Sequence, residues 1–264
     1  MIQCKVLKIQ SLASGSKGNA IYVASGTTQI LVDVGLTLPQ LLARMKTAKI
    51  DPNTIDAILI THEHGDHTAG LQRFIQRFKS VIHIHEDTAE IFGNLPRQKI
   101  HFFSDAFQIG DIYINYFDVP HDSQFCFGYT FQCGNAKVSL ATDLGRISPQ
   151  IIEKMADSQI VLLECNHDLV KLSRNTNYPA QLKRRITGSN GHLSNASSAL
   201  AIYELAKRNV QQVILAHLSE QNNSPGLAYR FVCDFLAAKG ITEGVDISVD
   251  VATQDEVGML FCID

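Results

Sequence analysis

The sequence predicts a mixed α/β protein, and three observations support that class. Short β-prone runs, separated by Gly, Ser, Asn and Thr, fill most of the first half of the chain. Segments with helical periodicity are interspersed among further β-prone runs in the second half. Several apolar runs end directly at a His, Asp or Glu, and strand ends at one edge of a sheet are where α/β proteins commonly assemble sites.

The first half of the chain is expected to consist mostly of strands. One of its runs, Ala57–Ile60, is wholly apolar, which is typical of a strand buried on both faces. The expected strands are Lys5–Ser11, Ala20–Ala24, Gln29–Val32, Ala57–Ile60, Val81–His85, Asp111–Asp118 and Cys126–Cys133. Two helices are expected between them, at Leu38–Lys49 and Ala69–Phe78.

The second half is expected to alternate strands and helices. The strands are Val138–Ala141, Ile160–Leu163, Val213–Ala216, Asp246–Val251 and Val257–Cys262. The helices are Pro149–Ala156, Pro179–Thr187, Asn195–Arg208 and Pro225–Lys239. The last of these is amphipathic, because Leu227, Phe231, Phe235 and Leu236 share one stripe.

The 264 residues are expected to form a single domain, 1–264, because no repeat, low-complexity segment or Pro/Gly-rich linker interrupts them. Apolar residues make up 45% and charged residues 19%, which is ordinary for a packed globular protein. The net charge of −3 does not by itself indicate nucleic-acid binding. It does not exclude it either, because a local basic patch is enough to engage phosphates.

The cysteines and the N-terminus favour a cytoplasmic protein that does not enter the membrane. Met1–Lys8 alternates like a strand and lacks the long apolar region of a secretion signal. No apolar stretch approaches the ~20 residues needed to span a bilayer. The six cysteines form no CxxC pair and lie in or beside apolar runs, so we expect buried free thiols, which suit a reducing compartment.

A histidine cluster follows the buried strand. His62, His64 and His67 fall within six residues, with Asp66 between the last two. Residues i and i+2 of an extended segment face the same side, so His62 and His64 can bind one ion, while Asp66 and His67 face a second. Imidazole and carboxylate suit Zn²⁺, Mn²⁺ or Fe²⁺. The alternative, a His-rich surface loop, fits poorly after a buried strand, where unpartnered imidazoles are costly.

Three further residues can complete the ligand set. His121 follows the strand Asp111–Asp118, Asp143 follows Val138–Ala141, and His217 follows Val213–Ala216. Each of these alone would be an ordinary strand-end residue. The joint pattern is what points to metal chemistry.

The order HxHxDH, isolated His, Asp, final His resembles the metallo-β-lactamase superfamily from Ser11 to Ala216. The resemblance implies a four-layer αβ/βα sandwich and a hydrolase with two divalent metal ions, Zn²⁺ or Mn²⁺. It implies that His62, His64 and His121 bind the first metal, that Asp66, His67 and His217 bind the second, and that Asp143 bridges them. Two ions ~3.5–4 Å apart can hold a hydroxide between them as the nucleophile. Asp66 is also a candidate catalytic residue.

Further motifs point to phosphodiesters as substrates. Gly191–Asn195 followed by Val213–Ser219 resembles the tRNA 3′-end-processing ribonuclease Z. The resemblance implies that His192 protonates the leaving oxygen, supported by an acidic residue, and Glu164 occupies the matching place. In the alternative interpretation Ser194 or Asn195 simply caps a helix, with His192 as a loop residue.

A still closer resemblance is to the small single-domain exonuclease-like members called WalJ or YycJ. It depends on Ser14–Ala20, Leu163–Asp168 and Gly191–Asn195. It implies a 5′-to-3′ exonuclease with nucleic acid as substrate, DNA rather than RNA. Only 27 residues separate Glu164 from His192, too few for the inserted cap domain of the larger β-CASP nucleases.

Two segments have two interpretations each. Lys171, Arg174 and Lys183–Arg185 either track a nucleic-acid backbone or form a solvated helix face. The Ser14–Asn19 segment either presents backbone N–H groups to a phosphate or is a hairpin turn closed by Asn19. His167 is a candidate to bind a substrate phosphate.

The ligand set also fits other hydrolases. A small-molecule cyclic phosphodiesterase is the first alternative, and a thioester or lactone hydrolase is the second. The sequence does not indicate the oligomeric state.

Overall fold

The structure is a computed structural model that describes residues 7–263. The chain forms two compact units. Unit 1 comprises the residues up to Tyr116, together with Phe131–Ala136 and the residues from Gln254 onward. Unit 2 comprises Phe117–Thr130 and Lys137–Thr253. The chain therefore enters and leaves each unit more than once.

Unit 1 contains a sheet with the strand order β14-β1-β2-β3-β4-β5-β6 among the described residues. Its strands are β1 (Leu7–Ala13), β2 (Ala20–Ala24), β3 (Gln29–Val32), β4 (Ala57–Leu59), β5 (Val81–His85), β6 (Ile100–Phe103) and β14 (Phe261–Ile263). Strands β14, β1, β2 and β3 pair antiparallel, whereas β3, β4, β5 and β6 pair parallel. The parallel strands bring their carboxyl ends to one edge of the sheet.

The helices of unit 1 begin where the sequence supplies caps or tight turns. They are α1 (Leu38–Thr47), α2 (Gly65–Thr68) and α3 (Leu71–Arg77), with 3₁₀ turns at Pro52–Thr54, Glu86–Thr88 and Arg97–Lys99. Helix α1 starts with a capping box between Thr37 and Gln40. The helix predicted at Ala69–Phe78 is α3, whereas α2 was not predicted; Gly70, which packs against the Leu36 carbonyl, lies between the two.

The second sheet has the order β13-β12-β11-β10-β9-β8-β7 within residues 7–263. Its strands are β7 (Phe107–Ile109), β8 (Ile112–Asp118), β9 (Phe127–Cys133), β10 (Ala136–Ala141), β11 (Ile160–Glu164), β12 (Gln212–Ala216) and β13 (Ser248–Val251). Strands β10, β11, β12 and β13 are parallel. The mixed α/β class with two sheets is confirmed.

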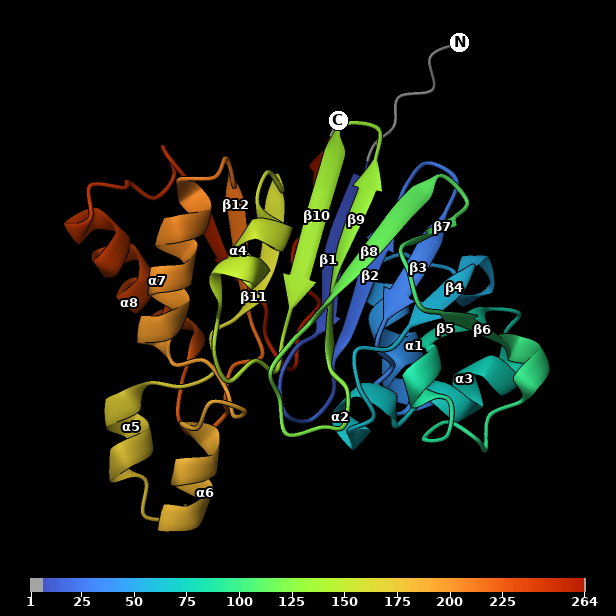
Figure 1. Ribbon diagram of the computed structural model, residues 1–264, viewed down its shortest axis with the longest axis horizontal. Coiled ribbons are helices and arrows are strands. Elements are labelled where there is room, and N and C mark those ends of the chain that lie inside the picture. The colour runs from blue at the N-terminus through green and yellow to red at the C-terminus, as the bar shows by residue number, and fades with distance from the viewer. Residues whose placement is uncertain (1–6, 264) are drawn as a thin grey trace. The chain divides into compact units, whose positions relative to one another are not determined.

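Unit 2 holds the remaining helices, α4 (Pro149–Met155), α5 (Leu169–Arg174), α6 (Ala180–Ile186), α7 (Asn195–Ala206) and α8 (Pro225–Ala238). Ser148 caps α4 and Ser194 caps α7 through their side-chain oxygens. Helices α7 and α8 lie side by side, and so do the short helices α5 and α6 (Figure 1).

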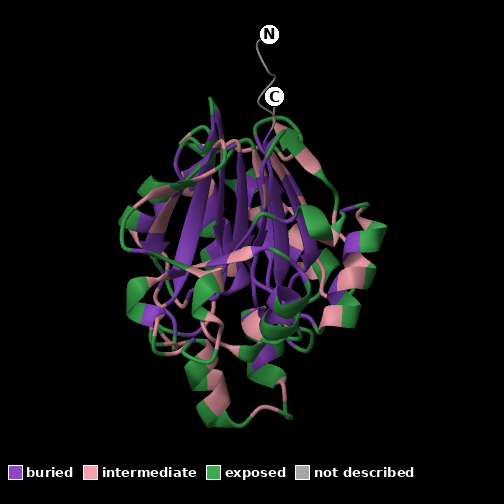
Figure 2. Cartoon of the chain, turned by 90° about the vertical axis from the view of Figure 1, so that its right-hand side faces the viewer, coloured by how far each residue is buried: buried purple, intermediate pink, exposed green. Residues whose placement is uncertain are grey.

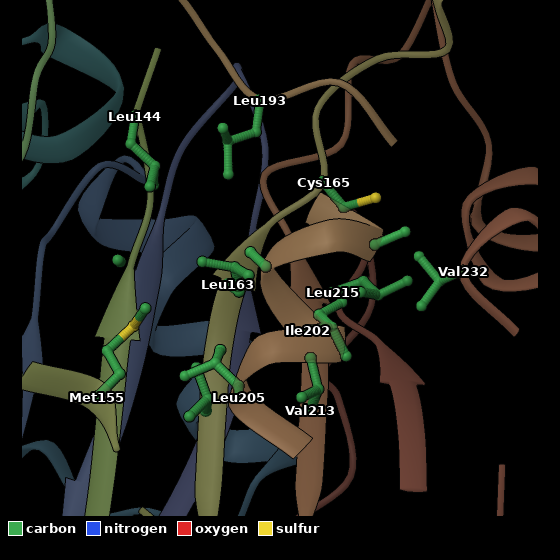
Figure 3. Close-up of a cluster of buried hydrophobic side chains, with 14 of the residues drawn as sticks. Leu144, Met155, Leu163, Cys165, Leu193, Ile202, Leu205, Val213, Leu215 and Val232 are labelled. Carbon is green, nitrogen blue, oxygen red and sulfur yellow. The ribbon is translucent and has the colours of Figure 1, made fainter. Parts of the chain in front are cut away.

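Apolar side chains from the strands and helices of unit 2 form one packed cluster. Leu163 of β11 and Leu215 of β12 lie among Ile202 and Leu205 of α7 and Val232 of α8 (Figure 3). The strands are mostly buried along their length, whereas the helices carry exposed residues on one side (Figure 2). The buried cluster fixes the strand ends that carry the polar residues described below.

Several expectations need correction. Strands β6 and β7 and helix α5 were not predicted, and the last strand is Phe261–Ile263 rather than Val257–Cys262. Lys5 and Val6 of the first predicted strand, and Cys4, lie outside the described residues.

The cysteines are only partly as expected. Cys126, Cys133 and Cys165 are buried free thiols, but Cys233 is half-buried and Cys262 is exposed. The last strand is short and leaves the Cys262 side chain on its exposed side, so a neighbouring apolar run did not guarantee burial. The expected cytoplasmic location stays a prediction. No helix within residues 7–263 is long and apolar enough to cross a bilayer.

Candidate metal centre

Three parallel strands of unit 2 end in polar residues, as the sequence predicts. Asp143 follows β10, Glu164 is the last residue of β11, and His217 follows β12. Because parallel strands bring their carboxyl ends to the same edge, these side chains meet there. With His192, which precedes α7, they form a group whose potential ligand atoms all lie within 4.8 Å of one another.

Glu164 organises this group. It is fully buried, and its Oε1 accepts hydrogen bonds from Nδ1 of His192 and from Nδ1 of His217, each at 2.8 Å. Its Oε2 accepts from the backbone N–H of Leu193 at 2.8 Å and of Leu144 at 3.1 Å. Burial alone would raise the pKa of Glu164, but the attraction and hydrogen bonds of the two histidines outweigh it and lower the pKa to about 2.

An ionised Glu164 fixes the tautomer of both imidazoles. Each imidazole donates a hydrogen bond from its Nδ1–H to the carboxylate. Its Nε2 therefore points away from Glu164. For His217 this orientation is the one that a metal ligand needs. The predicted contact between Glu164 and His192 is present, whereas the second contact, to His217, was not predicted.

His192 is the more accessible of the two imidazoles, with 20% of its side chain exposed. Its Nδ1 lies 3.8 Å from Oδ1 of Asp143. Burial works to lower the pKa of His192, but the charge and hydrogen bond of Glu164 prevail and raise it.

His121 lies in the same unit, after β8. Its Nδ1 donates to the carbonyl oxygen of Gly191 at 3.3 Å, and its ring centroid lies 5.3 Å from that of His192. Its Nε2 lies 3.2 Å from Oδ1 of Asp122 and 3.8 Å from Oδ1 of Asp143. Burial lowers the pKa of His121 despite these carboxylates, so its imidazole is neutral near pH 7 and suited to bind a metal.

Unit 1 gathers the histidine cluster in a loop and a short helix. Strand β4 ends at Leu59, His64 is the N-cap of α2, and Asp66 and His67 lie on that helix. The ring of His62 lies 4.6 Å from that of His64 and 4.1 Å from that of His67, measured between centroids. The i and i+2 residues thus come together through a helix start rather than through the alternation of a strand.

Asp33 supports this cluster, and sequence reasoning missed it. Its Oδ2 accepts from Nδ1 of His67 at 2.7 Å and from the hydroxyl of Thr61 at 2.9 Å, while its Oδ1 accepts from the N–H of Thr61 at 2.9 Å. Asp33 directly follows the apolar strand β3. The rule that singled out Asp143 and Glu164, an acid at the end of an apolar run, would have found it.

The backbone is strained at three of these strand ends. Asp33, Asp143 and His217 have φ values of 63°, 58° and 54°, in the left-handed region that non-glycine residues seldom occupy. Such conformations cost of order 1–3 kcal/mol each and cluster at functional sites, where the surroundings hold them.

The Ser14–Asn19 segment is tied to the histidine helix. The Asn19 side chain accepts from the N–H of Gly15 at 2.9 Å and donates to the Gly15 carbonyl at 3.1 Å. The Asn19 N–H donates to the carbonyl of Asp66 at 2.7 Å, and its side-chain nitrogen lies 3.1 Å from Nε2 of His67. These contacts support the hairpin-turn interpretation and place the turn against helix α2.

His167 is buried beside this chemistry in unit 2. It is 1% exposed, and neither ring nitrogen has a hydrogen-bond partner within residues 7–263. Burial lowers the pKa of His167 to about 4, so the ring is neutral near pH 7.

The donor set fits a divalent cation. The predicted ligands offer neutral imidazoles and carboxylates, which suit Zn²⁺ and Mn²⁺. Two of the predicted ligands, His67 and His217, are oriented through Nδ1 by a buried carboxylate. Asp33 orients His67 and Glu164 orients His217, as is usual for histidines that bind metals.

Comparisons with known proteins agree with this chemistry. Residues 28–218 match the model of the beta-lactamase superfamily domain. The chain is 35% identical over 244 residues to a protein of Bacillus anthracis named exodeoxyribonuclease YycJ, covering 90% of this chain and 92% of that one. It is 32% identical over 250 residues to exodeoxyribonuclease WalJ of Streptococcus pneumoniae, covering 92% and 93%.

A solved structure shares the fold. The metallo-β-lactamase fold protein YhfI of Bacillus subtilis superposes with a TM-score of 0.74 at 17% identity, covering 98% of this chain and all of that one. The family match, the two relatives and the fold agree with one another. This chain therefore belongs to the metallo-β-lactamase superfamily, alongside the YycJ and WalJ proteins, and it is a metal-dependent hydrolase.

Proposed function

We propose that this protein is a two-metal phosphodiesterase that degrades nucleic acid, DNA rather than RNA, as a 5′-to-3′ exonuclease. The observation that carries the proposal is the Glu164 carboxylate, which holds His192 and His217 on one oxygen. It joins an accessible imidazole suited to proton transfer with a buried one suited to metal binding. The names of the two long relatives support DNA as the substrate.

The order of the motifs along the chain supports the assignment of the proposed metal ligands. The ligands are His62, His64, Asp66 and His67 of unit 1 and His121, Asp143 and His217 of unit 2. Bound divalent cations would polarise the phosphoryl oxygens and activate the attacking water.

The protein's own groups complete the reaction. Hydroxide, formed when water loses a proton to the solvent, attacks phosphorus through its oxygen, and the bond between phosphorus and the leaving oxygen breaks. His192 gives its Nε2 proton to the leaving oxygen, while Glu164 holds the opposite nitrogen and keeps the ring in position. Asp66 helps to place the nucleophile in this proposal, as a carboxylate beside His67 on α2.

The role of His192 as proton donor can be tested with two substrates that differ in their leaving group. Single-stranded DNA has a poor leaving oxygen that needs a proton, whereas the nitrophenolate of bis(p-nitrophenyl) phosphate leaves without one. We expect His192→Asn to slow DNA digestion ~100-fold or more and to slow the nitrophenyl ester far less. Rates are measured on purified protein reconstituted with Mn²⁺ or Zn²⁺.

Two results would overturn the proposal. Equal slowing of both substrates would remove His192 from the proton-transfer step. A metal-loaded wild type that cleaves neither phosphodiester, but turns over a cyclic phosphate, a thioester or a lactone, would assign the protein to another hydrolase class.

A further inference from the structure

Helices α5 and α6 form a basic projection of unit 2 that the proposed reaction does not use. They lie side by side (Figure 1), and Nζ of Lys183 on α6 donates to the carbonyl of Ser173 on α5 at 2.7 Å. The segment 168–191 that contains them connects β11 to α7, so it begins and ends beside Glu164 and His192.

The charge of this segment is opposite to that of the chain. Five Lys and Arg residues stand in it against a single acid, Asp168, whereas the whole chain has a net charge of −3. The Asp168 carboxylate caps α5 by accepting from the N–H of Lys171 at 2.7 Å. Arg185 pairs with Asp122, but Arg174 and Arg184 are exposed. The segment is therefore a local concentration of positive charge.

A shallow cavity of about 510 Å³, open to solvent, lies between α5 with the segment after it and the loop that follows β12. Its lining is cationic, amide and apolar, with no acidic side chain: Val170, Lys171, Arg174, Asn175, Asn177 and Gln221. A volume in this range accommodates a group of nucleotide size. Its two cations, Lys171 and Arg174, favour an anion over a cation.

The cavity wall is preorganised by hydrogen bonds to the loop that follows His217. The Asn175 side chain donates to Oδ1 of Asn222 at 2.8 Å and to Oε1 of Gln221 at 3.3 Å. Nζ of Lys171 donates to the carbonyl of Asn223 at 3.1 Å. The same loop accepts the N–H of Asp168 at the carbonyl of Asn222, 2.9 Å away. These hydrogen bonds hold the cavity wall against the loop that follows His217.

We propose that this cavity binds the sugar–phosphate backbone of a nucleic-acid strand, outside the place where the phosphodiester is cleaved. The inference rests on the proposed function, since a strand with its reacting phosphate near Glu164 and His192 would extend along the adjoining basic segment. A polymer fits better than a lone phosphate, because the cations continue from α5 onto α6. Val170, which is 53% exposed, offers an apolar surface beside them.

Charge reversal at Arg174 tests the proposal. Binding of a fluorescent single-stranded oligonucleotide is measured by anisotropy over a range of salt concentrations, in chelator, so that no cleavage occurs. We expect Arg174→Glu to weaken binding at least ~10-fold and to reduce the slope of log K against log salt by ~0.7 for each phosphate that the variant no longer neutralises. Lys171→Glu should act in the same direction.

The matched control is Arg230→Glu, the same charge change at an exposed position of α8 in the same unit. It should bind with wild-type affinity and salt slope. Thermal unfolding of each variant verifies that it is folded. In the metal-loaded enzyme, Arg174→Glu should raise KM for the oligonucleotide while the rate on bis(p-nitrophenyl) phosphate, too small to reach the cavity, is unchanged.

The outcomes separate this inference from the proposed function. If the wild type digests DNA and Arg174→Glu binds and digests it equally well, the cavity is not a backbone site, although the nuclease assignment stands. If the wild type binds DNA through Arg174 but cleaves no phosphodiester, the binding site stands and the nuclease assignment falls. If Arg174→Glu and Arg230→Glu weaken oligonucleotide binding equally, the effect comes from the net charge of the protein alone. That result would contradict the inference.

Discussion

Two buried carboxylates fix the orientation of histidines at the candidate centre. Asp33 in unit 1 accepts from Nδ1 of His67, and Glu164 in unit 2 accepts from Nδ1 of both His192 and His217. In each case the carboxylate determines which ring nitrogen is presented to a ligand. A single residue such as Glu164 therefore affects metal binding and proton transfer together.

Substituting Glu164 by Gln should impair both functions. The amide keeps the shape, but whichever way it turns, its NH₂ faces either the two imidazoles or the N–H groups of Leu144 and Leu193. We expect the catalytic rate and metal affinity each to fall roughly 10–100-fold, measured by DNA digestion and by metal titration. Glu204→Gln, at a partly exposed position of α7 where the carboxylate pairs with Lys207, is the control. Unchanged metal affinity in Glu164→Gln would contradict the orienting role.

His167 should make stability depend on pH. Its pKa is about 4 in the folded protein and 6.5 in the reference state, because burial disfavours the charged ring. Between these values the unfolded chain binds more protons, so the free energy of unfolding falls as the pH drops from 6.5 toward 4. The expected loss is up to ~1.4 kcal/mol per pH unit.

Urea unfolding at pH 7 and pH 5, in chelator, measures this dependence. His167→Gln removes the titrating group, so its free energy of unfolding should change less between the two pH values than that of the wild type. Identical changes in the two proteins would show that His167 is not the group responsible.

Sequence reasoning identified the candidate ligand residues because their chemistry is visible in the residue types. It did not find Asp33, because that acid follows an apolar run as Asp143 does but matches no position of the ligand motif. It found only one partner of Glu164, because the number of imidazoles that converge on a carboxylate depends on the packing of strands remote in sequence. Their roles as ligands and catalysts stay predictions.

At the scale of elements, the loop between β3 and α1 fixes the position of α2, the helix that carries the proposed ligands Asp66 and His67. The N–H of Gly35 donates to the Asn19 carbonyl at 2.8 Å, and the N–H of Val34 donates to the carbonyl of His67 at 2.8 Å. A Cβ added at Gly35 would overlap the carbonyl of Asp66. This close approach of two backbones leaves no room for a side chain.

Gly35→Ala should therefore displace α2. We expect it to lower the free energy of unfolding by roughly 1–3 kcal/mol and to weaken metal binding, since Asp66 and His67 move with the helix. Gly26→Ala is the matched control, because a Cβ there has nothing within 4 Å. Denaturant unfolding and metal titration of both variants decide the point, and a Gly35→Ala protein as stable as Gly26→Ala would refute it.

The elements that were missed are short or depend on contacts. Helix α5 has six residues and begins because Asp168 caps it, so it is too short for periodicity to appear. Strands β6 and β7 have four and three residues, too few for an alternating pattern to be recognised in the sequence. The long strands and helices were predicted because their buried faces repeat often enough to be recognised.

At the scale of the whole molecule, each of the two units is built from more than one segment of the chain. Unit 1 takes segments from before, within and after unit 2 in the sequence. Neither unit can be completed by one continuous stretch of chain, so the single domain over residues 1–264 remains our prediction.

Unfolding should then be one cooperative event. We expect the urea midpoints measured by circular dichroism and by hydrogen exchange of peptides from each unit to coincide. Adding Zn²⁺ or Mn²⁺ to ~100 times the dissociation constant should stabilise the protein by ~2.7 kcal/mol per independent site. Two separated midpoints in the metal-free protein would contradict a single domain.

The most direct test of the central claim is the digestion of DNA and RNA strands labelled at the 5′ or the 3′ end, single- and double-stranded, by the metal-loaded protein beside its Asp66→Ala variant. We predict that the wild type shortens DNA stepwise from the 5′ end, and that the folded variant does not. A metal-loaded wild type that leaves every strand intact, or a variant that digests DNA at the wild-type rate, would contradict the account.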